Sequence, residues 1–273
     1  MKLFKGMSAG TTALIHPGGP PTQEKIAAAL EPVRGVGADL FVAVDEHPRA
    51  FTPDGEISPP SAAVRLAAAH LHAQATSRTS WDFFIDGMEM QVRREGEEYL
   101  INHGPWSLAG GEPARAEGHD SVLHLTGLTD PRPALRIRLG GRTIAVAALA
   151  SAAELTDVDF HTPPRAEPTA DLVAATTIMG EREVDLTGEA GTVIGTERIG
   201  AVQVRGFDFQ AGEMFSADTL AIAAGAAART WLGEGAATEW IAVFGGGNTR
   251  VVLGEHALAA AEAQIFAEIN WWG

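Results

Sequence analysis

Cysteine is absent from the 273 residues of this chain. Its absence excludes disulfide bonds, thiolate metal ligands and thiol nucleophiles. No run of about 18 apolar residues occurs, so the sequence predicts no transmembrane helix. Residues 1–10 contain two lysines but no apolar core of the kind found in secretory signals. We therefore expect a cytoplasmic protein.

Basic residues are also few, with 20 Lys and Arg against 35 Asp and Glu and a formal net charge of −15. A nucleic-acid partner needs a basic surface, so none is expected. An anionic membrane surface is excluded as a partner for the same reason. An anionic small molecule would have to be held by helix dipoles or by a few well-placed arginines, because the field of the whole protein repels it.

The common cofactor and metal motifs are missing as well. The run of glycines at 245–247 is not followed by Lys and Ser or Thr, and it joins two expected strands, so it is not a phosphate loop. No dinucleotide fingerprint, nucleophile elbow or zinc-protease helix is present. The 9 histidines show no metal-ligand spacing. We expect neither a cofactor nor a metal.

Local patterns predict an α+β protein. A helix is expected at 23–30 and a short one at 151–155, whereas 102–106 is expected to be a loop. Strands are expected at 1–7, 13–16, 39–44, 49–52, 81–85, 89–93, 98–101, 122–125, 135–139, 143–149, 172–177, 202–209, 241–244 and 249–253.

Two alanine-rich helices dominate this pattern, at 58–72 and 220–232. Both are apolar on most faces, which indicates burial rather than a surface position. Each follows a group of strands and is opened by hydroxyl side chains, so the chain repeats one plan twice. We expect an N-terminal lobe over 1–130 and a C-terminal lobe over 131–260.

Five stretches, in the same order along the chain, resemble the superfamily of diaminopimelate epimerases and phenazine-biosynthesis (PhzF-like) isomerases. They are 1–12, 34–39 (Arg-Gly-Val-Gly-Ala-Asp), 51–56 (Phe-Thr-Pro-Asp-Gly-Glu), 141–155 and 218–221 (Asp-Thr-Leu-Ala). The resemblance implies two similar lobes, each a bent, barrel-like mixed sheet around one buried alanine-rich helix. It also implies a cleft between the lobes and a C-terminal strand, about 261–273, that returns to the first lobe.

This sequence differs from the superfamily at the catalytic positions. The two catalytic cysteines of the epimerases fall near Pro60 and Ile222, which cannot move a proton. The Glu and His of the phenazine-type isomerases fall at Ala38 and Ala62. Their Asp is kept as Asp218. Neither mechanism can therefore be carried over intact.

Asp218 is the first candidate for a general acid or base, because a carboxylate in an apolar cleft can be tuned for proton transfer. An Asp in the first turn of a helix can also simply stabilise the helix dipole. Glu56 is the candidate for a partner on the opposite face of the substrate. His103, in the expected loop, is interpreted as a surface or hydrogen-bonded histidine.

Substrate contacts are expected at the starts of the two buried helices, where free amides can bind a carboxylate or stabilise an enolate. The candidates are Ser58, Ser61, Arg65, Ser216 and Thr219, with Thr11 and Thr12 where the resemblance places the cleft. The hydroxyls can equally be ordinary helix caps. Arg65 can equally pair with an acid.

These residues predict a cofactor-independent isomerase that moves a proton and a double bond in a small carboxylate-bearing intermediate. The alanine-, glycine-, arginine- and proline-rich composition is compatible with specialised, antibiotic-type metabolism, and within the superfamily the cysteine-free isomerases of 4-alkylproline pathways look similar. Two alternatives stay open: an amino-acid epimerase or racemase with non-cysteine bases, and a pseudoenzyme that binds a small molecule. We also consider a homodimer.

Overall fold

The computed structural model of the chain describes residues 2–6, 12–36, 38–45, 49–57, 70, 79–85, 88–96, 98–109, 120–187, 193–209, 212–214, 217–245 and 247–268. The first alanine-rich helix expected from the sequence, 58–72, lies outside these residues except for His70, which is helical. Among the residues described, no helix is both long enough and apolar enough to cross a membrane.

The chain forms two compact units, Met1–Asn102 with Ala260–Gly273, and His103–Ala259. The sequence placed the division near 130 instead. Residues 103–109 and 121–124 belong to the second unit because their strands pair with a strand of that unit, Arg132–Leu139. The C-terminal strand pairs with Lys2–Gly6 of the first unit, which is the return that the resemblance implies.

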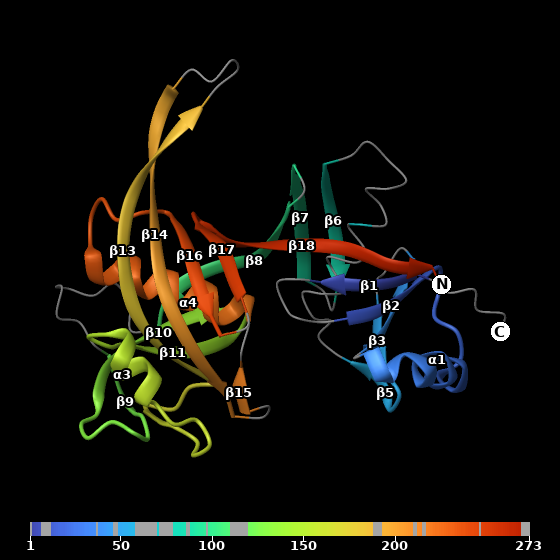
Figure 1. Ribbon diagram of the computed structural model, residues 1–273, viewed down its shortest axis with the longest axis horizontal. Helices are drawn as coiled ribbons and strands as arrows, with labels where there is room; N and C mark the ends of the chain where they lie inside the picture. Colours follow the sequence, from blue (N-terminus) through green and yellow to red (C-terminus); the bar gives the residue numbers. More distant parts are fainter. Residues whose placement is uncertain are drawn as a thin grey trace. The chain divides into compact units, whose positions relative to one another are not determined.

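The first unit is built mainly from short strands (Figure 1). Its elements are β1 (Lys2–Gly6), β2 (Thr12–Pro17), α1 (Gln23–Leu30), a 3-10 helix (Glu31–Val36), β3 (Ala38–Val44), β4 (Arg49–Thr52), β5 (Gly55–Ile57), β6 (Ser80–Ile85), β7 (Met88–Glu95) and the start of β8 (Glu98–Leu108). Strands β2 and β3 are parallel, and α1 is the crossover between them. The other described pairs of this unit are antiparallel.

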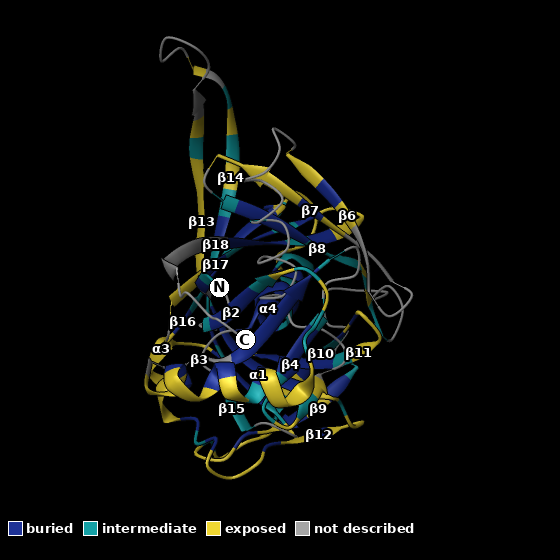
Figure 2. Cartoon of the chain, turned by 90° about the vertical axis from the view of Figure 1, so that its right-hand side faces the viewer, coloured by how far each residue is buried: buried dark blue, intermediate teal, exposed yellow. Residues whose placement is uncertain are grey.

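Helix α1 confirms the expected helix at 23–30. It buries Ile26, Ala29 and Leu30, which recur at the spacing of one helix face. These residues pack in one cluster with Phe41 of β3 and Phe51 of β4. The opposite side of the helix is exposed (Figure 2). Helix α1 is therefore an ordinary amphipathic crossover on the surface of its sheet.

The second unit contains longer strands and one long helix. Its elements are the end of β8, β9 (Ser121–His124), β10 (Arg132–Leu139), β11 (Arg142–Ala148), α3 (Ala152–Asp157), β12 (Arg165–Glu167), β13 (Leu172–Thr187), β14 (Val193–Asp208), β15 (Gly212–Met214), α4 (Asp218–Leu232), β16 (Glu239–Phe244), β17 (Gly247–Leu253) and β18 (His256–Glu268). The short helix α3 is capped by Ser151, whose hydroxyl accepts from the Glu154 amide.

The strands of this unit close into a barrel. The pairs β8–β10, β10–β11, β13–β14, β16–β17 and β17–β18 are antiparallel, and β11–β13 and β14–β16 are parallel. Strand β18 also pairs with β8, which completes the circle. Helix α4 is the crossover between the parallel strands β14 and β16, and it packs against β10, β11, β13, β14, β16 and β17. The barrel therefore encloses α4.

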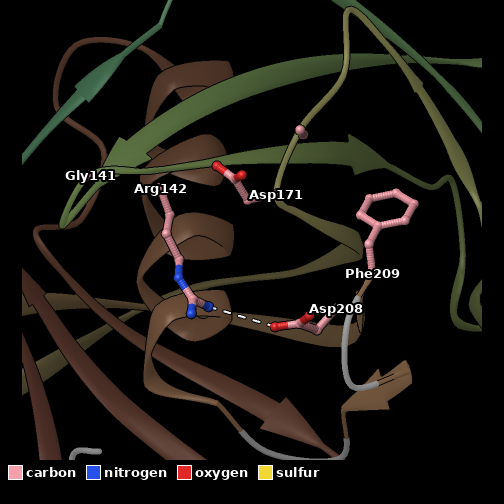
Figure 3. Close-up of a pocket in the computed structure, with 6 residues that line it drawn as sticks. Gly141, Arg142, Asp171, Asp208 and Phe209 are labelled. Carbon is pink, nitrogen blue, oxygen red and sulfur yellow. Dashed lines mark ion pairs between the residues drawn. The ribbon is translucent and has the colours of Figure 1, made fainter. Parts of the chain in front are cut away.

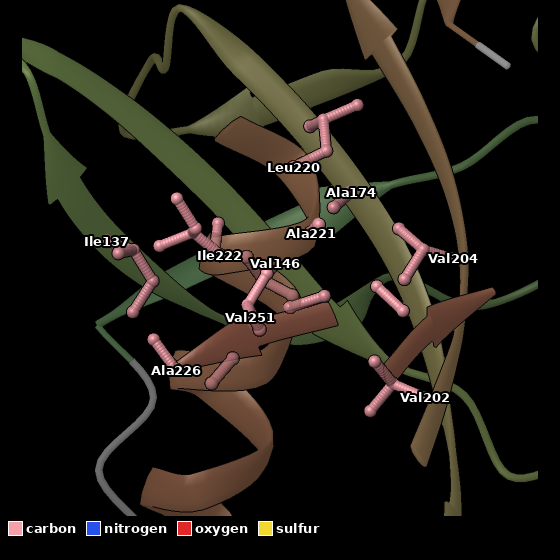
Figure 4. Packing of buried hydrophobic residues seen from close by; sticks show 14 of the residues in the cluster. Ile137, Val146, Ala174, Val202, Val204, Leu220, Ala221, Ile222, Ala226 and Val251 are labelled. Carbon is pink, nitrogen blue, oxygen red and sulfur yellow. The ribbon is translucent and has the colours of Figure 1, made fainter. Parts of the chain in front are cut away.

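Helix α4 forms the core of the unit because its side chains are small. Between Leu220 and Ala228 every residue is buried, and most of these residues are alanine. They pack against inward-facing side chains of the barrel, among them Ile137, Val146 and Val204 (Figure 4). The prediction of a buried alanine-rich helix here is confirmed. The helix begins at Asp218 rather than at residue 220, with Ala217 as its N-cap.

Two strands differ from expectation in length. Strands β13 and β14 run for 16 residues each, well beyond the expected 172–177 and 202–209. Their outer parts pair with each other and are mostly exposed (Figure 2). Strand β8 runs through 102–106, where a loop was expected. In both places the backbone pairing that holds the strand is long-range, and short-range patterns do not report it.

We predict that Gly200→Ala destabilises the second unit. A Cβ at Gly200 would lie 2.4 Å from ring atoms of Trp240, which is fully buried and donates its indole N–H to the Ala237 carbonyl. The ring has no free space to move into, and overpacking of this kind costs about 1–3 kcal/mol. Urea unfolding measures the change, with Gly35→Ala as the comparison, because a Cβ at Gly35 would meet nothing within 4 Å and its backbone needs no positive φ. An unchanged midpoint for Gly200→Ala would contradict the packing described here.

Candidate active site

The start of α4 is the candidate active site. The first hydrogen bond within the helix runs from the Ala221 amide to the Ala217 carbonyl, so the amides of residues 218–220 have no acceptor inside the helix. The N-cap residue, Ala217, makes no side-chain cap at this end. The helix start therefore presents N–H groups that have no acceptor within the helix, together with the positive end of the helix dipole.

Asp218 occupies the first position of this helix and is buried. The residue is 5% exposed, and its side chain 3%. Neither carboxylate oxygen accepts a hydrogen bond from the part of the chain that the structure describes. A buried carboxylate without hydrogen bonds is expensive for a fold, since polar groups are normally paired when they leave water. Asp218 therefore has a structural cost that ordinary helix capping does not explain.

His103 is the ionisable neighbour of Asp218. Its Nε2 lies 3.6 Å from Asp218 Oδ2, and its side chain is 10% exposed. This distance is longer than a hydrogen bond but within the range of an ion pair. Nε2 is also buried and has no hydrogen bond from the described residues. Asp218 and His103 therefore face each other, and their facing atoms have no hydrogen-bond partner among the described residues.

Local structure explains why His103 reaches this position. It lies on β8 just before Gly104, whose φ of +85° is favourable for glycine and strained for other residues. Strand β8 is then fixed by Trp106, whose indole N–H donates to the Gly254 carbonyl at 3.1 Å and whose ring packs against the α4 core. The prediction that His103 lies in a loop was wrong, and its pairing with Asp218 was missed.

The first turn of α4 is positioned from the other side by Gly206. A Cβ at Gly206 of β14 would lie 2.1 Å from Leu220 Cδ1, so only glycine lets Leu220 pack against this strand. Leu220 is fully buried and two residues from Asp218. The close contact between β14 and α4 therefore fixes where the carboxylate lies.

A buried hydroxyl lies on the strand that packs along α4. Thr249 is 1% exposed and its Oγ1 has no hydrogen-bond partner among the described residues. Strand β17 runs in the same direction as the helix, since Leu253 accepts from Arg229 near the helix end while Val251 packs at Gly225 in its middle. Thr249 is two residues before Val251 and faces the same way, so it lies toward the first half of α4.

Other predicted site residues are placed as follows. Thr219 is in the first turn of α4 and is partly buried. Glu56 is on β5 of the first unit, where its half-exposed carboxylate lies 3.9 Å from Arg49. Thr12 begins β2 and pairs with Lys5 and Ala38. Five predicted site residues lie outside the described residues: Thr11, Ser58, Ser61, Arg65 and Ser216.

Two histidines of the first unit have lowered pKa values. Burial lowers the pKa of His16, which lies on β2 beside Phe41. Burial is also the main cause that lowers the pKa of His70, and the charges of Arg94 and Lys2 add to it. His70 is hydrogen-bonded to Tyr99 at 3.0 Å, and burial raises the pKa of that phenol. Both histidines are therefore biased toward the neutral form.

A separate surface pocket of about 240 Å3 lies where β10 turns into β11 (Figure 3). Its charged groups already have partners: Arg142 is 3.6 Å from Asp208, and Asp171 accepts from the Thr143 amide. Its lining includes neither His103 nor Asp218. Among the described residues, no group of three His, Asp or Glu side chains is arranged to hold a metal ion.

We predict that Asp218→Asn stabilises the protein. A buried carboxylate costs several kcal/mol when few interactions compensate it, whereas a charge at a helix start contributes about 0.3–1 kcal/mol. The desolvation cost is larger, so the neutral amide is expected to raise the free energy of unfolding by about 1–2 kcal/mol. Urea unfolding measures it. The exposed Asp157→Asn serves as the control and should change stability by less than about 0.5 kcal/mol. A clear loss of stability in Asp218→Asn would mean that this carboxylate holds the fold together.

Comparison with known proteins agrees with the fold. No protein-family model matches the sequence. A phenazine biosynthesis PhzC/PhzF protein from Clostridium difficile superposes with a TM-score of 0.58 and 15% identity, covering 99% of this chain and 98% of that one. A PhzF-family protein from Bacillus anthracis gives 0.59 and 13%, and a predicted epimerase from Pseudomonas aeruginosa 0.57 and 12%; both matches cover 97% of this chain and 96% of the other. The chain therefore has the α+β fold of the PhzF-like and diaminopimelate-epimerase-like proteins, as the resemblance predicted.

Proposed function

We propose that this protein is a cofactor-independent isomerase that moves a proton, and with it a double bond, in a small carboxylate-bearing molecule. The observation that carries the proposal is the buried Asp218 carboxylate, whose oxygens accept no hydrogen bond from the described residues, at the positive end of α4. Unsatisfied buried polar groups of this kind occur where a ligand completes them.

The chemistry follows from this arrangement. Asp218 as a carboxylate takes a proton from the carbon next to the substrate carboxylate, and the electron pair of that C–H bond joins the neighbouring double bond. The negative charge spreads over the substrate as a dienolate, which free amides at the start of α4 can stabilise. Protonated Asp218 then returns the proton to the far carbon of the same system. One bond to hydrogen is broken and one is formed, and the protein ends unchanged.

The geometry favours isomerisation over inversion. Epimerisation needs two ionisable groups on opposite faces of one carbon. Asp218 and its ionisable neighbour His103 lie 3.6 Å apart, so both would approach a substrate from one side. A single carboxylate that takes and returns the proton on one face suits a double-bond shift. The antibiotic-type pathway and the likeness to 4-alkylproline isomerases are part of this proposal and rest on the sequence alone.

We predict that the protein catalyses a double-bond shift in a β,γ-unsaturated carboxylate. Two probes are 3,4-dehydroproline and trans-3-hexenoate, incubated with the protein in deuterium oxide and followed by NMR and ultraviolet absorption. An isomerase produces the conjugated product and a new absorption band. Deuterium appears at the far carbon in proportion to how far the proton held by the enzyme exchanges with the solvent before it is returned. The isomerisation rate should be at least about 100-fold lower in Asp218→Asn and unchanged in Asp157→Asn.

Other results would contradict this function. Deuterium at the stereocentre without a new absorption band indicates an epimerase. Saturable changes in ligand signals without any exchange indicate a binding protein that has lost its chemistry. Equal rates for the wild type and Asp218→Asn would remove Asp218 from the mechanism.

Glu56, predicted from the sequence as a partner on the opposite face of the substrate, is needed if the reaction is an epimerisation, and Glu56→Gln tests this role in the same assay. If Glu56 handles a proton, the variant should lose about 100-fold or more in kcat. Arg49→Gln is the matched control, because it breaks the same ion pair and leaves the carboxylate in place. Equal, small effects of both variants would show that Glu56 forms a surface ion pair and takes no part in catalysis.

A further inference from the structure

We propose that His103 is the positioning residue of Asp218, and that the two side chains work as one proton-handling pair. The inference rests on the proposed function, because it concerns how the same carboxylate is kept ready for proton transfer. In this pair His103 presents a proton from Nε2 to Asp218 Oδ2, and Oδ1 is left to face the substrate.

The facing atoms of the pair have no other hydrogen bonds within the described structure. Asp218 Oδ1 and Oδ2 and His103 Nε2 are all buried, and none has a hydrogen-bond partner among the residues described. The two side chains are 3% and 10% exposed, so bulk water screens their interaction little.

The carboxylate is short of hydrogen-bond donors. A buried carboxylate without donors is costly, and each donor that faces it offsets part of that cost. The positive end of α4 is one favourable interaction, and an Nε2–H directed at Oδ2 adds a second from a different element. With Oδ2 occupied by His103, the other oxygen is the one free to accept the substrate proton. The imidazole therefore decides which oxygen of Asp218 faces the substrate.

The geometry of this pair differs from that of a fully bonded ion pair in the same unit. Arg205 lies 2.6 Å from Glu213 and also donates to the Leu155 carbonyl near the end of α3. His103 Nε2 and Asp218 Oδ2 instead lie 3.6 Å apart, and neither atom has a hydrogen bond from the described residues. Catalytic hydrogen bonds are often long in the absence of substrate and shorten when it binds. The open geometry is what a pair that changes its protonation state requires.

The first test needs no substrate. In protein labelled with nitrogen-15 at histidine, the His103 ring signals of the wild type should show a proton on Nε2, and Asp218→Asn should change those signals. The exposed His124, which lies 4.0 Å from Glu167, provides the matched control and should be unaffected by Asp218→Asn. Identical His103 signals in both proteins would overturn the pairing, whatever reaction the protein catalyses.

The second test uses turnover of the unsaturated carboxylate probes. His103→Gln keeps a polar side chain of similar length and is expected to lower kcat about 100-fold while KM changes less than about threefold. Added imidazole should raise the turnover rate of His103→Ala at least tenfold, and it should leave the rate of Asp218→Asn unchanged. His124→Gln should behave as the wild type does.

The outcomes separate this inference from the proposed function. Wild-type turnover with an unchanged kcat in His103→Gln would overturn the role of His103 and leave the isomerase intact. An absence of turnover in the wild type, together with histidine signals that respond to Asp218→Asn, would overturn the isomerase and leave the pair. If His103→Gln lowers only the unfolding midpoint and imidazole rescues nothing in His103→Ala, His103 is structural.

Discussion

The enclosure of α4 by a closed barrel is the constraint from which the rest of the second unit follows. A helix can lie inside a barrel of this kind only if its side chains are small, and alanine fills most of its buried positions. Strands on several sides then fix it by close contacts, such as Gly206 of β14 against Leu220 and Gly225 of the helix against Trp240 of β16. A helix held in this way cannot shift its start to satisfy a side chain, so the groups at that end keep the positions that the barrel gives them.

The buried carboxylate is the consequence that matters for function. At the surface, an Asp in a first helical turn contributes modestly to stability and can bind water. At the start of α4 the same residue is 5% exposed and its oxygens have no hydrogen bonds from the described residues. Sites that lower the stability of a fold are kept where a ligand or a reaction uses them. Strand β8 brings His103 to 3.6 Å from this carboxylate and so gives it an ionisable neighbour.

The shared fold does not decide the chemistry. The similar structures are 12–15% identical to this chain, and a fold of this kind can carry different reactions. This chain contains no cysteine, which removes the acid–base pair of the diaminopimelate epimerases. The histidine that faces Asp218 lies on β8.

The amino-acid sequence by itself determined the local elements and the class of fold. Helices α1 and α4 and most strands follow from the spacing of apolar residues, because burial of one face requires that spacing. The resemblance in five short motifs gave the architecture and pointed to Asp218 at a helix start. Tertiary structure alone decided that Asp218 is buried and that His103 lies 3.6 Å from it. It also decided that the strand through 102–106 continues and that β13 and β14 are long. Such features depend on contacts between residues far apart in the chain, which closure of the barrel creates and which no local pattern encodes.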